Sequence, residues 1–190
     1  RDSQQVADMV EKAMTAFGRI DILVNAAGGS FAAPALEISD NGWDAVLREN
    51  LKSVFVCCKA VGKVMVAQGK GSIINFASMA GRGSSAGNAH YGVAKAGIIS
   101  LTQSLAEEWG PYHIRVNALA PGTMKTEGWV RVQAQWRGRQ EADIMKNIPL
   151  GRLGTSDDAA GLAVFLASDA ADYITGQTIN LNGGERGYYS

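Results

Sequence analysis

The sequence has few cysteines, no excess of charge of one sign and no long hydrophobic run. Each of these absences excludes one or more classes of protein. Its two cysteines, Cys57 and Cys58, are adjacent within a helical pattern, which argues against a structural disulfide and favours a reducing compartment. The 18 basic and 18 acidic residues cancel, so overall charge does not indicate binding to nucleic acid or to a membrane. Because no apolar run of 18 residues and no signal-peptide pattern occurs, we expect a cytoplasmic protein.

Histidine is scarce as well, and this bears on metal binding. His90 and His113 are the two histidines, and neither stands at ligand spacing from another histidine, a cysteine or a carboxylate. We therefore expect both to be ordinary structural residues, and we expect no metal site. Small uncharged molecules are the partners that this composition favours.

What the sequence does contain is a regular alternation of short apolar segments with helical patterns. At 190 residues and 46% hydrophobic content the chain can bury a full core, so we expect one domain over residues 1–190. Strands are predicted at 20–24, in "GSIINFAS", in "HIRVNALAPG" and in "GQTINLNGG", with helices between them. This alternation predicts an α/β fold with a doubly wound parallel sheet in three α/β/α layers. The strand at 20–24 is expected to be buried on both faces.

Polar or small residues follow three of these strands. Residues 25–28, "NAAG", follow the first, Ser78 follows the second, and Pro121 with Gly122 ends the third. Ligands of open parallel sheets bind beyond the carboxyl ends of the strands, so these groups are expected to line one site.

Tyr91 and Lys95 lie one helical turn apart in the helix that follows Ser78. Taken alone, such a pair is more often a half-buried tyrosine and a solvated lysine. A free phenol has a pKa of about 10, and a nearby ammonium favours the phenolate. A phenol tuned in this way can donate the proton that a carbonyl oxygen needs when the carbonyl is reduced.

Taken together, these motifs resemble the short-chain dehydrogenase/reductase family over all 190 residues. The resemblance is carried by "NAAG", by Asn50 in "ENLKSVF", by Ser78 in "INFASMAG", by Tyr91-x-x-x-Lys95, by "RVNALAPG" and by "FLASDAADYITGQTINLNGG". It implies a Rossmann-like fold and an enzyme that transfers hydride between NAD or NADP and a carbonyl or alcohol carbon.

The resemblance also implies roles for individual residues. Tyr91 would be the proton donor and Ser78 would orient the substrate oxygen. Lys95 would hold the nicotinamide ribose hydroxyls, and Asn50 would bind a water in a proton relay to that lysine. The implied catalytic residues are Asn50, Ser78, Tyr91 and Lys95, and the implied cofactor-binding residues are Asn25, Ala26, Ala27, Gly28, Tyr91, Lys95, Pro121, Gly122 and Met124.

One part of the family pattern is not found in the sequence. The family begins with a strand, a glycine-rich turn and a helix that hold the pyrophosphate, followed by a second βα unit that selects NAD or NADP. The glycine-rich stretch at 81–87 does not replace them, because it precedes the catalytic tyrosine and does not open a helix after a strand. We therefore expect that an N-terminal βαβα portion of about 60 residues is absent from this chain. The choice between NAD and NADP stays open.

Three functions remain possible at this stage. The leading one is a 3-oxoacyl reductase-like or alcohol dehydrogenase-like enzyme, acting on a small carbonyl or alcohol substrate or on an acyl thioester. The second is an enoyl-CoA or dienoyl-CoA reductase-like enzyme, and the third is an inactive truncated paralogue that serves as an oligomer partner or nucleotide sensor.

Two further expectations concern assembly and the region after the third strand. The family's long helices, here about 42–68 and 90–109, usually pair across a two-fold axis, so we expect a homodimer or homotetramer. Trp129, Val132 and Trp136 share one helical face, which indicates either core packing or a substrate lid at about 123–150.

Overall fold

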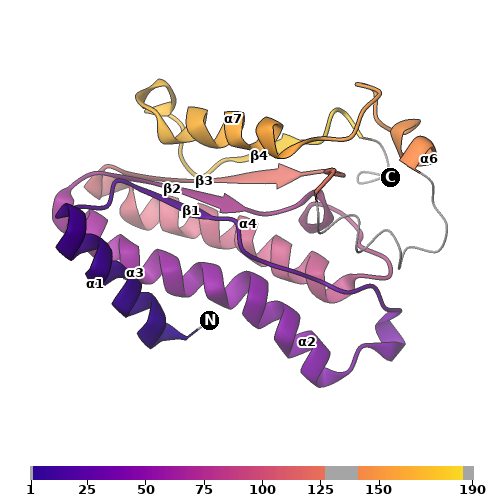
Figure 1. Cartoon of the computed structure of the whole chain (residues 1–190), viewed down its shortest axis with the longest axis horizontal. Helices are drawn as coiled ribbons and strands as arrows, with labels where there is room; N and C mark the ends of the chain where they lie inside the picture. The colour runs from indigo at the N-terminus through magenta and orange to yellow at the C-terminus, as the bar shows by residue number, and fades with distance from the viewer. Residues whose placement is uncertain (1, 127–140, 186–190) are drawn as a thin grey trace.

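The computed structural model describes residues 2–126 and 141–185, which form an α/β fold around one parallel sheet (Figure 1). The elements, in chain order, are α1 (Ser3–Phe17), β1 (Ile22–Asn25), α2 (Asp40–Leu47), the π-helical turn η2 (Arg48–Lys52), α3 (Ser53–Gln68), β2 (Gly71–Phe76), α4 (Ala89–Trp109), β3 (Ile114–Pro121), α6 (Glu141–Met145), α7 (Ser156–Ala167) and β4 (Thr178–Leu181). Helix α1 is capped at both ends. The Asp2 side chain accepts from the backbone N–H of Gln4 at its start, and Gly18 ends it in the left-handed conformation.

The four strands pair in the order β1-β2-β3-β4, and all of the pairs are parallel. Helices α3 and α4 pack against one face of the sheet, α1 packs on α3, and α7 covers the other face (Figure 1). These three layers confirm the predicted parallel, Rossmann-like architecture. Because every strand is parallel, all of the carboxyl ends meet at one edge of the sheet.

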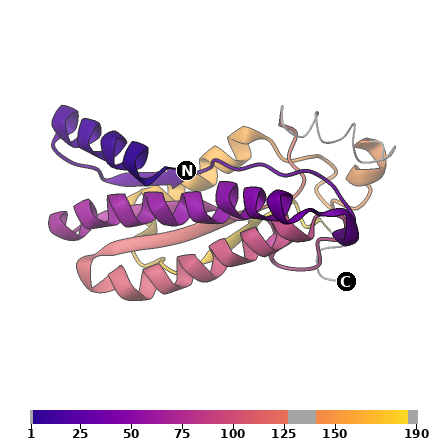
Figure 2. The same cartoon turned by 90° about the horizontal axis from the view of Figure 1, so that it is seen from below.

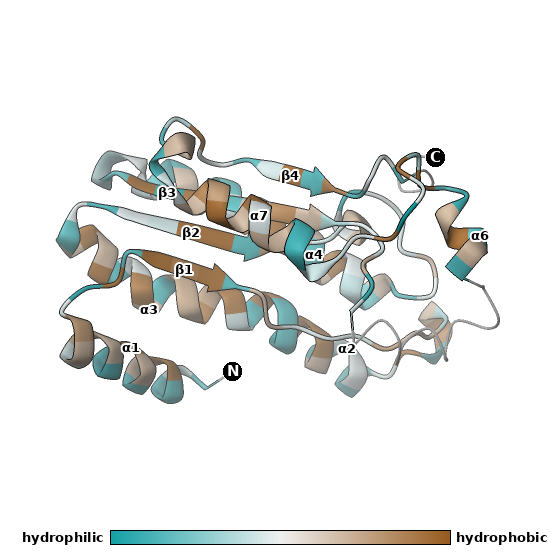
Figure 3. Ribbon diagram, turned by 45° about the horizontal axis from the view of Figure 1, so that its top comes forward, coloured by the Kyte–Doolittle hydropathy of each residue, from teal (hydrophilic) through white to brown (hydrophobic). Residues whose placement is uncertain are grey.

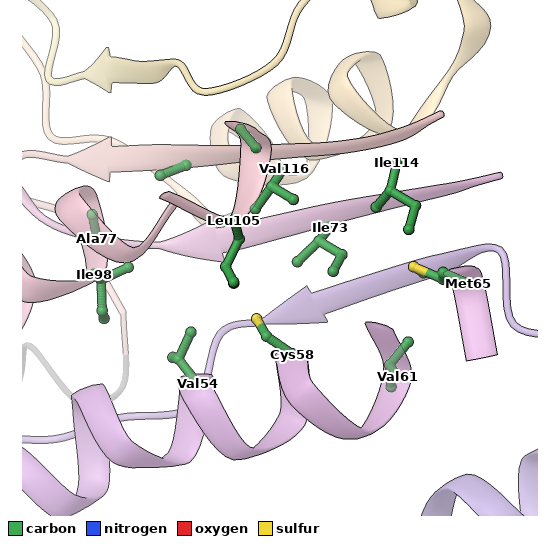
Figure 4. Packing of buried hydrophobic residues seen from close by; sticks show 12 residues of the cluster. Val54, Cys58, Val61, Met65, Ile73, Ala77, Ile98, Leu105, Ile114 and Val116 are labelled. Carbon is green, nitrogen blue, oxygen red and sulfur yellow. The ribbon is translucent and has the colours of Figure 1, made fainter. Parts of the chain in front are cut away.

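Alternate residues of β2 build the hydrophobic core on both sides of the sheet, as the two-residue period of a strand requires. Ile73 points toward α3 and α4, where it packs with Val54, Cys58 and Met65 (Figure 4). Its neighbour Ile74 belongs to the cluster under α7, which is made of Ile74, Leu119, Ala159, Leu166 and Ala171. Each large apolar side chain buried in this way contributes roughly 1.5 to 3 kcal/mol.

Helices α3 and α4 run side by side beneath the sheet (Figure 2). Gly62 of α3 allows this close approach, because a Cβ atom at that position would lie 2.6 Å from the ring of Trp109 in α4. The contact fixes the carboxyl end of α4 beside α3. The opposite end of α4, which carries Tyr91 and Lys95, lies at the carboxyl edge of the sheet.

The prediction that the first strand is buried on both faces is wrong. Ile22 and Val24 of β1 are 48% and 47% exposed, whereas Ile73 and Ile74 of β2 are fully buried. The reason is the position of α7, which lies over β2 and β3 and leaves β1 outside the area that it covers (Figure 3). Among the described residues, β1 also pairs with β2 alone, so its outer edge is open.

Several expectations are not tested by the described residues. The central half of the proposed lid at about 123–150 lies outside them, and so do Trp129, Val132 and Trp136. The absence of an N-terminal βαβα portion and the single-domain boundary of 1–190 stay predictions. Within residues 2–126 and 141–185, no helix is long and apolar enough to cross a membrane. In the same residues, no three histidine, cysteine or acidic side chains are grouped closely enough to hold a metal ion.

Candidate active site

The ends of β1, β2 and β3 bring the predicted site residues to one edge of the sheet. Parallel pairing sets Asn25 beside Asn75, and Phe76 beside Leu119. The segments that follow these strands, at 26–29, 77–81 and 122–126, therefore leave the sheet on the same side. The amino-terminal part of α4 lies under this edge (Figure 1).

Ser78, Tyr91 and Lys95 meet at this edge, as the sequence predicts. The Ser78 side chain lies close enough to the Tyr91 phenol to lower its pKa in part, and Lys95 Nζ lies 5.4 Å from the centre of the Tyr91 ring. Gly81 makes the arrangement possible, because a Cβ there would lie 2.6 Å from the backbone carbon of Lys95. The loop that carries Ser78 can therefore rest directly on α4.

Lys95 is a buried cation at the centre of the site. Its side chain is buried, with the residue 5% exposed, and Nζ donates a hydrogen bond of 2.8 Å to the Phe76 carbonyl at the end of β2. Burial lowers the pKa of Lys95 to about 8. The amine therefore keeps its proton at neutral pH and can lose it one unit higher.

The balance of effects on Tyr91 differs from the sequence-based expectation. Burial raises the pKa of the Tyr91 phenol, and the interaction with Ser78 lowers it in part. Desolvation, which disfavours the phenolate, is the largest influence, so the shift runs opposite to the one expected from the ammonium of Lys95. In this structure Tyr91 is held as a neutral phenol, the form that donates a proton.

Asn50 lies in the π-helical turn η2 between α2 and α3, and it is fully buried. Its Nδ2 donates to the carbonyls of Gly29 at 2.8 Å and of Val46 at 2.9 Å. Its Oδ1 is buried and has no hydrogen-bond partner among the described residues. A Cβ on Gly28 would lie 2.4 Å from that oxygen and 3.6 Å from Lys95 Nζ, so the oxygen faces the space near Lys95. This open acceptor is suited to a water molecule.

The "NAAG" residues divide into two groups. Asn25 is buried and its Nδ2 donates to Asn75 Oδ1 at 2.9 Å, while Asn75 Nδ2 donates to Thr102 Oγ1 at 3.0 Å. The Asn25 side chain is thus directed into the core, where it fixes the turn. The next three residues, Ala26, Ala27 and Gly28, are exposed at the edge of the sheet and can lie against a ligand.

The turn after β3 places Pro121, Gly122 and Met124 at the same edge. Met124 forms a parallel bridge with Gly154, in which Gly154 N–H donates to Thr123 O and Lys125 N–H donates to Gly154 O. The bridge therefore uses the peptide groups on either side of Met124 and turns the N–H of Met124 itself away from Gly154.

Sequence reasoning missed several residues that support the site. Asn75 and Thr102 hold Asn25, and nothing in their local patterns marks them, because their partnership depends on how β1, β2 and α4 pack. His90, considered structural, is fully buried beside Tyr91, and its ring packs edge-on against Phe31 at 4.5 Å between ring centres. Burial lowers the pKa of His90.

Comparisons with known proteins show that this chain is similar to reductases and dehydrogenases. Residues 1–185 match the sequence family described as Enoyl-(Acyl carrier protein) reductase. The "Probable 2,4-dienoyl-CoA reductase" of Bacillus subtilis is 42% identical over 187 residues, which cover 97% of this chain and 73% of that protein. The 3-oxoacyl-(acyl-carrier-protein) reductase of Thermotoga maritima is 39% identical over 183 residues, covering 96% and 73%.

The solved structures give the same result. A gluconate 5-dehydrogenase from Burkholderia cenocepacia, in complex with NADP and tartrate, superposes with a TM-score of 0.89 at 36% identity. The match covers 96% of this chain and 71% of that one.

Proposed function

The chain belongs to the short-chain dehydrogenase/reductase family and is an NAD(P)-dependent oxidoreductase, and on that premise we propose that Asn50, Ser78, Tyr91 and Lys95 form its catalytic site. The observation that carries the proposal is the meeting of Ser78, Tyr91 and Lys95 at the carboxyl edge of the sheet. The bound nicotinamide supplies or accepts the hydride. The protein has to orient the carbonyl or alcohol carbon and to move a proton at its oxygen.

Tyr91 and Ser78 act on the substrate oxygen. Because burial raises its pKa, Tyr91 is protonated at neutral pH and can donate to the oxygen of a carbonyl that is being reduced. The Ser78 side chain acts on the same phenol, so it is placed to hold the same substrate oxygen. In the opposite direction, the phenolate accepts the proton of the alcohol.

Lys95 and Asn50 restore the proton of Tyr91. The ammonium of Lys95 lies close to the phenol ring, and its pKa of about 8 is low enough for it to exchange protons near neutral pH. A water molecule that donates to Asn50 Oδ1 would connect this lysine to solvent, which gives the unpartnered oxygen a function. Each proton that leaves Tyr91 is then replaced through Lys95.

The described residues fit NAD or NADP in two respects. The exposed Ala26, Ala27 and Gly28 offer a turn with little side chain, and Gly28 has no room for a Cβ beside Asn50. The N–H of Met124 is directed away from Gly154, so it can meet the nicotinamide carboxamide. We propose that Asn25 acts indirectly by fixing the 26–28 turn, and that Pro121 and Gly122 shape the opposite wall.

For the substrate we propose a 3-oxoacyl thioester or a comparable small ketone. Support comes from the 3-oxoacyl reductase among the relatives and from the retention of Tyr91, which carbonyl reduction needs as a proton donor. The 2,4-dienoyl-CoA reductase relative favours a second candidate, reduction of an unsaturated acyl-CoA. The non-enzyme alternative is set aside, since the relatives are enzymes and the catalytic side chains meet.

Direct comparison of two thioesters separates the two candidates. Acetoacetyl-CoA and a 2,4-dienoyl-CoA are each supplied with NADPH and then with NADH, and kcat/KM is measured from cofactor absorbance. We expect acetoacetyl-CoA to be preferred by at least about tenfold, a difference of about 1.4 kcal/mol in transition-state binding. A preference for the dienoyl thioester would reject the 3-oxoacyl proposal.

We also propose a homodimer or homotetramer in the cytoplasm. Phe55 on α3 and Val93 on α4 are 45% and 48% exposed, so the helix pair presents apolar side chains away from the sheet. Light scattering at micromolar concentration tests this assembly, and a monomer would reject it.

The region at about 123–150 is proposed as the substrate lid, with its central residues outside the described structure.

A further inference from the structure

The chain reverses sharply after β4. Gly183 and Gly184 have φ angles of 60° and 79°, the left-handed region that favours glycine. Asn182 closes the turn, since its carbonyl accepts from the N–H of Glu185 at 2.9 Å and its side-chain oxygen accepts from the N–H of Gly184 at 3.2 Å. The reversal brings Glu185 back over the carboxyl edge of the sheet.

Glu185 is a buried carboxylate that binds the turn after β3. The residue is 8% exposed. One carboxylate oxygen accepts from the backbone N–H of Thr123 at 2.8 Å, and the other accepts from the Thr123 hydroxyl at 2.7 Å. The carboxylate also fills the space beside Gly122, where a Cβ would lie 2.5 Å from Oε2. Both carboxylate oxygens therefore accept hydrogen bonds from one residue of this turn, Thr123.

The turn is held from two sides. Gly154 binds the peptide groups on either side of Met124, and Glu185 binds the N–H and the side chain of Thr123. Thr123 directly precedes Met124, so a change in the Thr123 peptide rotates the N–H of Met124. Hydrogen bonds to a carboxylate are stronger than bonds between neutral groups, which suits Glu185 to fixing this short, half-buried turn.

We propose that Glu185 is a positioning residue for the nicotinamide dinucleotide, acting by fixing the turn at 122–124 through Thr123. The inference rests on the proposed cofactor site, in which the backbone of Met124 meets the carboxamide. Glu185 does not touch the reacting atoms. Its carboxylate orients the peptide that does bind, and it determines affinity rather than the proton-transfer step.

The test compares Glu185→Ala with Glu185→Gln in the full natural polypeptide. Loss of both acceptors in Glu185→Ala should raise the Kd for NADPH or NADH, measured by fluorescence titration with whichever binds more tightly, by about tenfold or more. Glu185→Gln can still accept from the Thr123 N–H and donate to its hydroxyl, so it should restore most of the affinity. Hydrogen exchange at residues 122–125 should be faster in Glu185→Ala alone.

Asp2 provides the control. Its carboxylate accepts from the backbone N–H of Gln4 at 2.8 Å and caps the start of α1, which packs on α3. Asp2→Ala should lower the unfolding temperature and leave the cofactor Kd unchanged. Equal Kd values for wild type and Glu185→Ala would overturn the proposal, as would equal weakening by the two alanine variants. A wild type that binds neither dinucleotide would reject the proposed function, and this inference with it.

Discussion

At the scale of single residues, buried polar contacts hold the candidate site together: Lys95 Nζ donates to the Phe76 carbonyl, and Asn75 joins Asn25 to Thr102. Ser78, Tyr91 and Lys95 could be predicted because a distinctive spacing and a strand end mark each of them. Asn75 and Thr102, which anchor Asn25, could not, since buried polar pairs depend on the packing of separate elements. The direction of the Tyr91 pKa shift could not be predicted either, because it depends mainly on the burial of the phenol.

The first prediction concerns the hydroxyl of Tyr91. Tyr91→Phe keeps the buried ring and removes the proton donor, so kcat should fall by about 10²-fold or more, the usual scale for general acid catalysis. The unfolding temperature and the cofactor Kd should change little. Steady-state kinetics with acetoacetyl-CoA measure the effect, and turnover near that of wild type would show that another group donates the proton.

The second prediction concerns the cost of burying the Lys95 ammonium, which lowers the free energy of unfolding. Its pKa is about 8 in the folded protein against 10.5 for a free lysine, so the folded state disfavours the charged form. At about 1.4 kcal/mol per pKa unit, holding the ammonium costs roughly 3 kcal/mol below pH 8. Between pH 8 and 10.5 the unfolded chain binds the extra proton, so stability rises with pH in this window.

Lys95→Met should therefore abolish activity and stabilise the protein at neutral pH. The gain should be about 1 to 3 kcal/mol, because the lost hydrogen bond to Phe76 offsets part of it. Urea unfolding at about pH 7 and about pH 9.5 measures the difference, which should be smaller at the higher pH. A variant less stable than wild type at neutral pH would contradict the prediction.

At the scale of elements, the sequence pattern located the helices and strands well. The features that it did not predict depend on contacts between elements. The continuous helical pattern at 42–68 is interrupted by the π-helical turn that holds Asn50, a feature typical of functional sites. The apolar run of β1 predicted burial on both faces, whereas α7 covers only the strands beside it. An apolar run shows that a strand can be buried, but it is buried only where another element packs on it.

The third prediction compares the two glycines that follow "NAA". A Cβ on Gly28 would lie 2.4 Å from Asn50 Oδ1, so Gly28→Ala should displace either the 26–28 turn or the buried amide. A Cβ on Gly29 would lie 3.5 Å from Glu49 Oε2, an ordinary contact. Gly28→Ala should reduce kcat/KM by about tenfold or more, because displacement by about an ångström is enough for that. Gly29→Ala serves as the control and should stay near wild type. Similar losses in both variants would mean that backbone flexibility matters here, and the space beside Asn50 does not.

At the scale of the whole molecule, the exposed side chains of β1 determine how a polypeptide of residues 1–190 behaves by itself. Ile22 and Val24 are about half exposed, and the outer edge of β1 is unpaired among the described residues. An open, apolar edge strand is a template for pairing with another chain. We therefore predict that this polypeptide aggregates at micromolar concentration when it is produced by itself.

A charge on the exposed face of β1 provides the test. Val24→Lys places a charge on that face and should reduce aggregation, because an edge lysine opposes strand pairing. Val164→Lys on α7, where the wild-type side chain is 69% exposed, adds the same charge outside β1 and should leave aggregation unchanged. Light scattering over time, on matched concentrations of the three proteins, separates these outcomes. If Val164→Lys protected as well as Val24→Lys, general charge repulsion would explain the effect, and β1 would not be the site of self-association. A wild-type polypeptide that stays dispersed at micromolar concentration would show that its β1 edge is protected in solution.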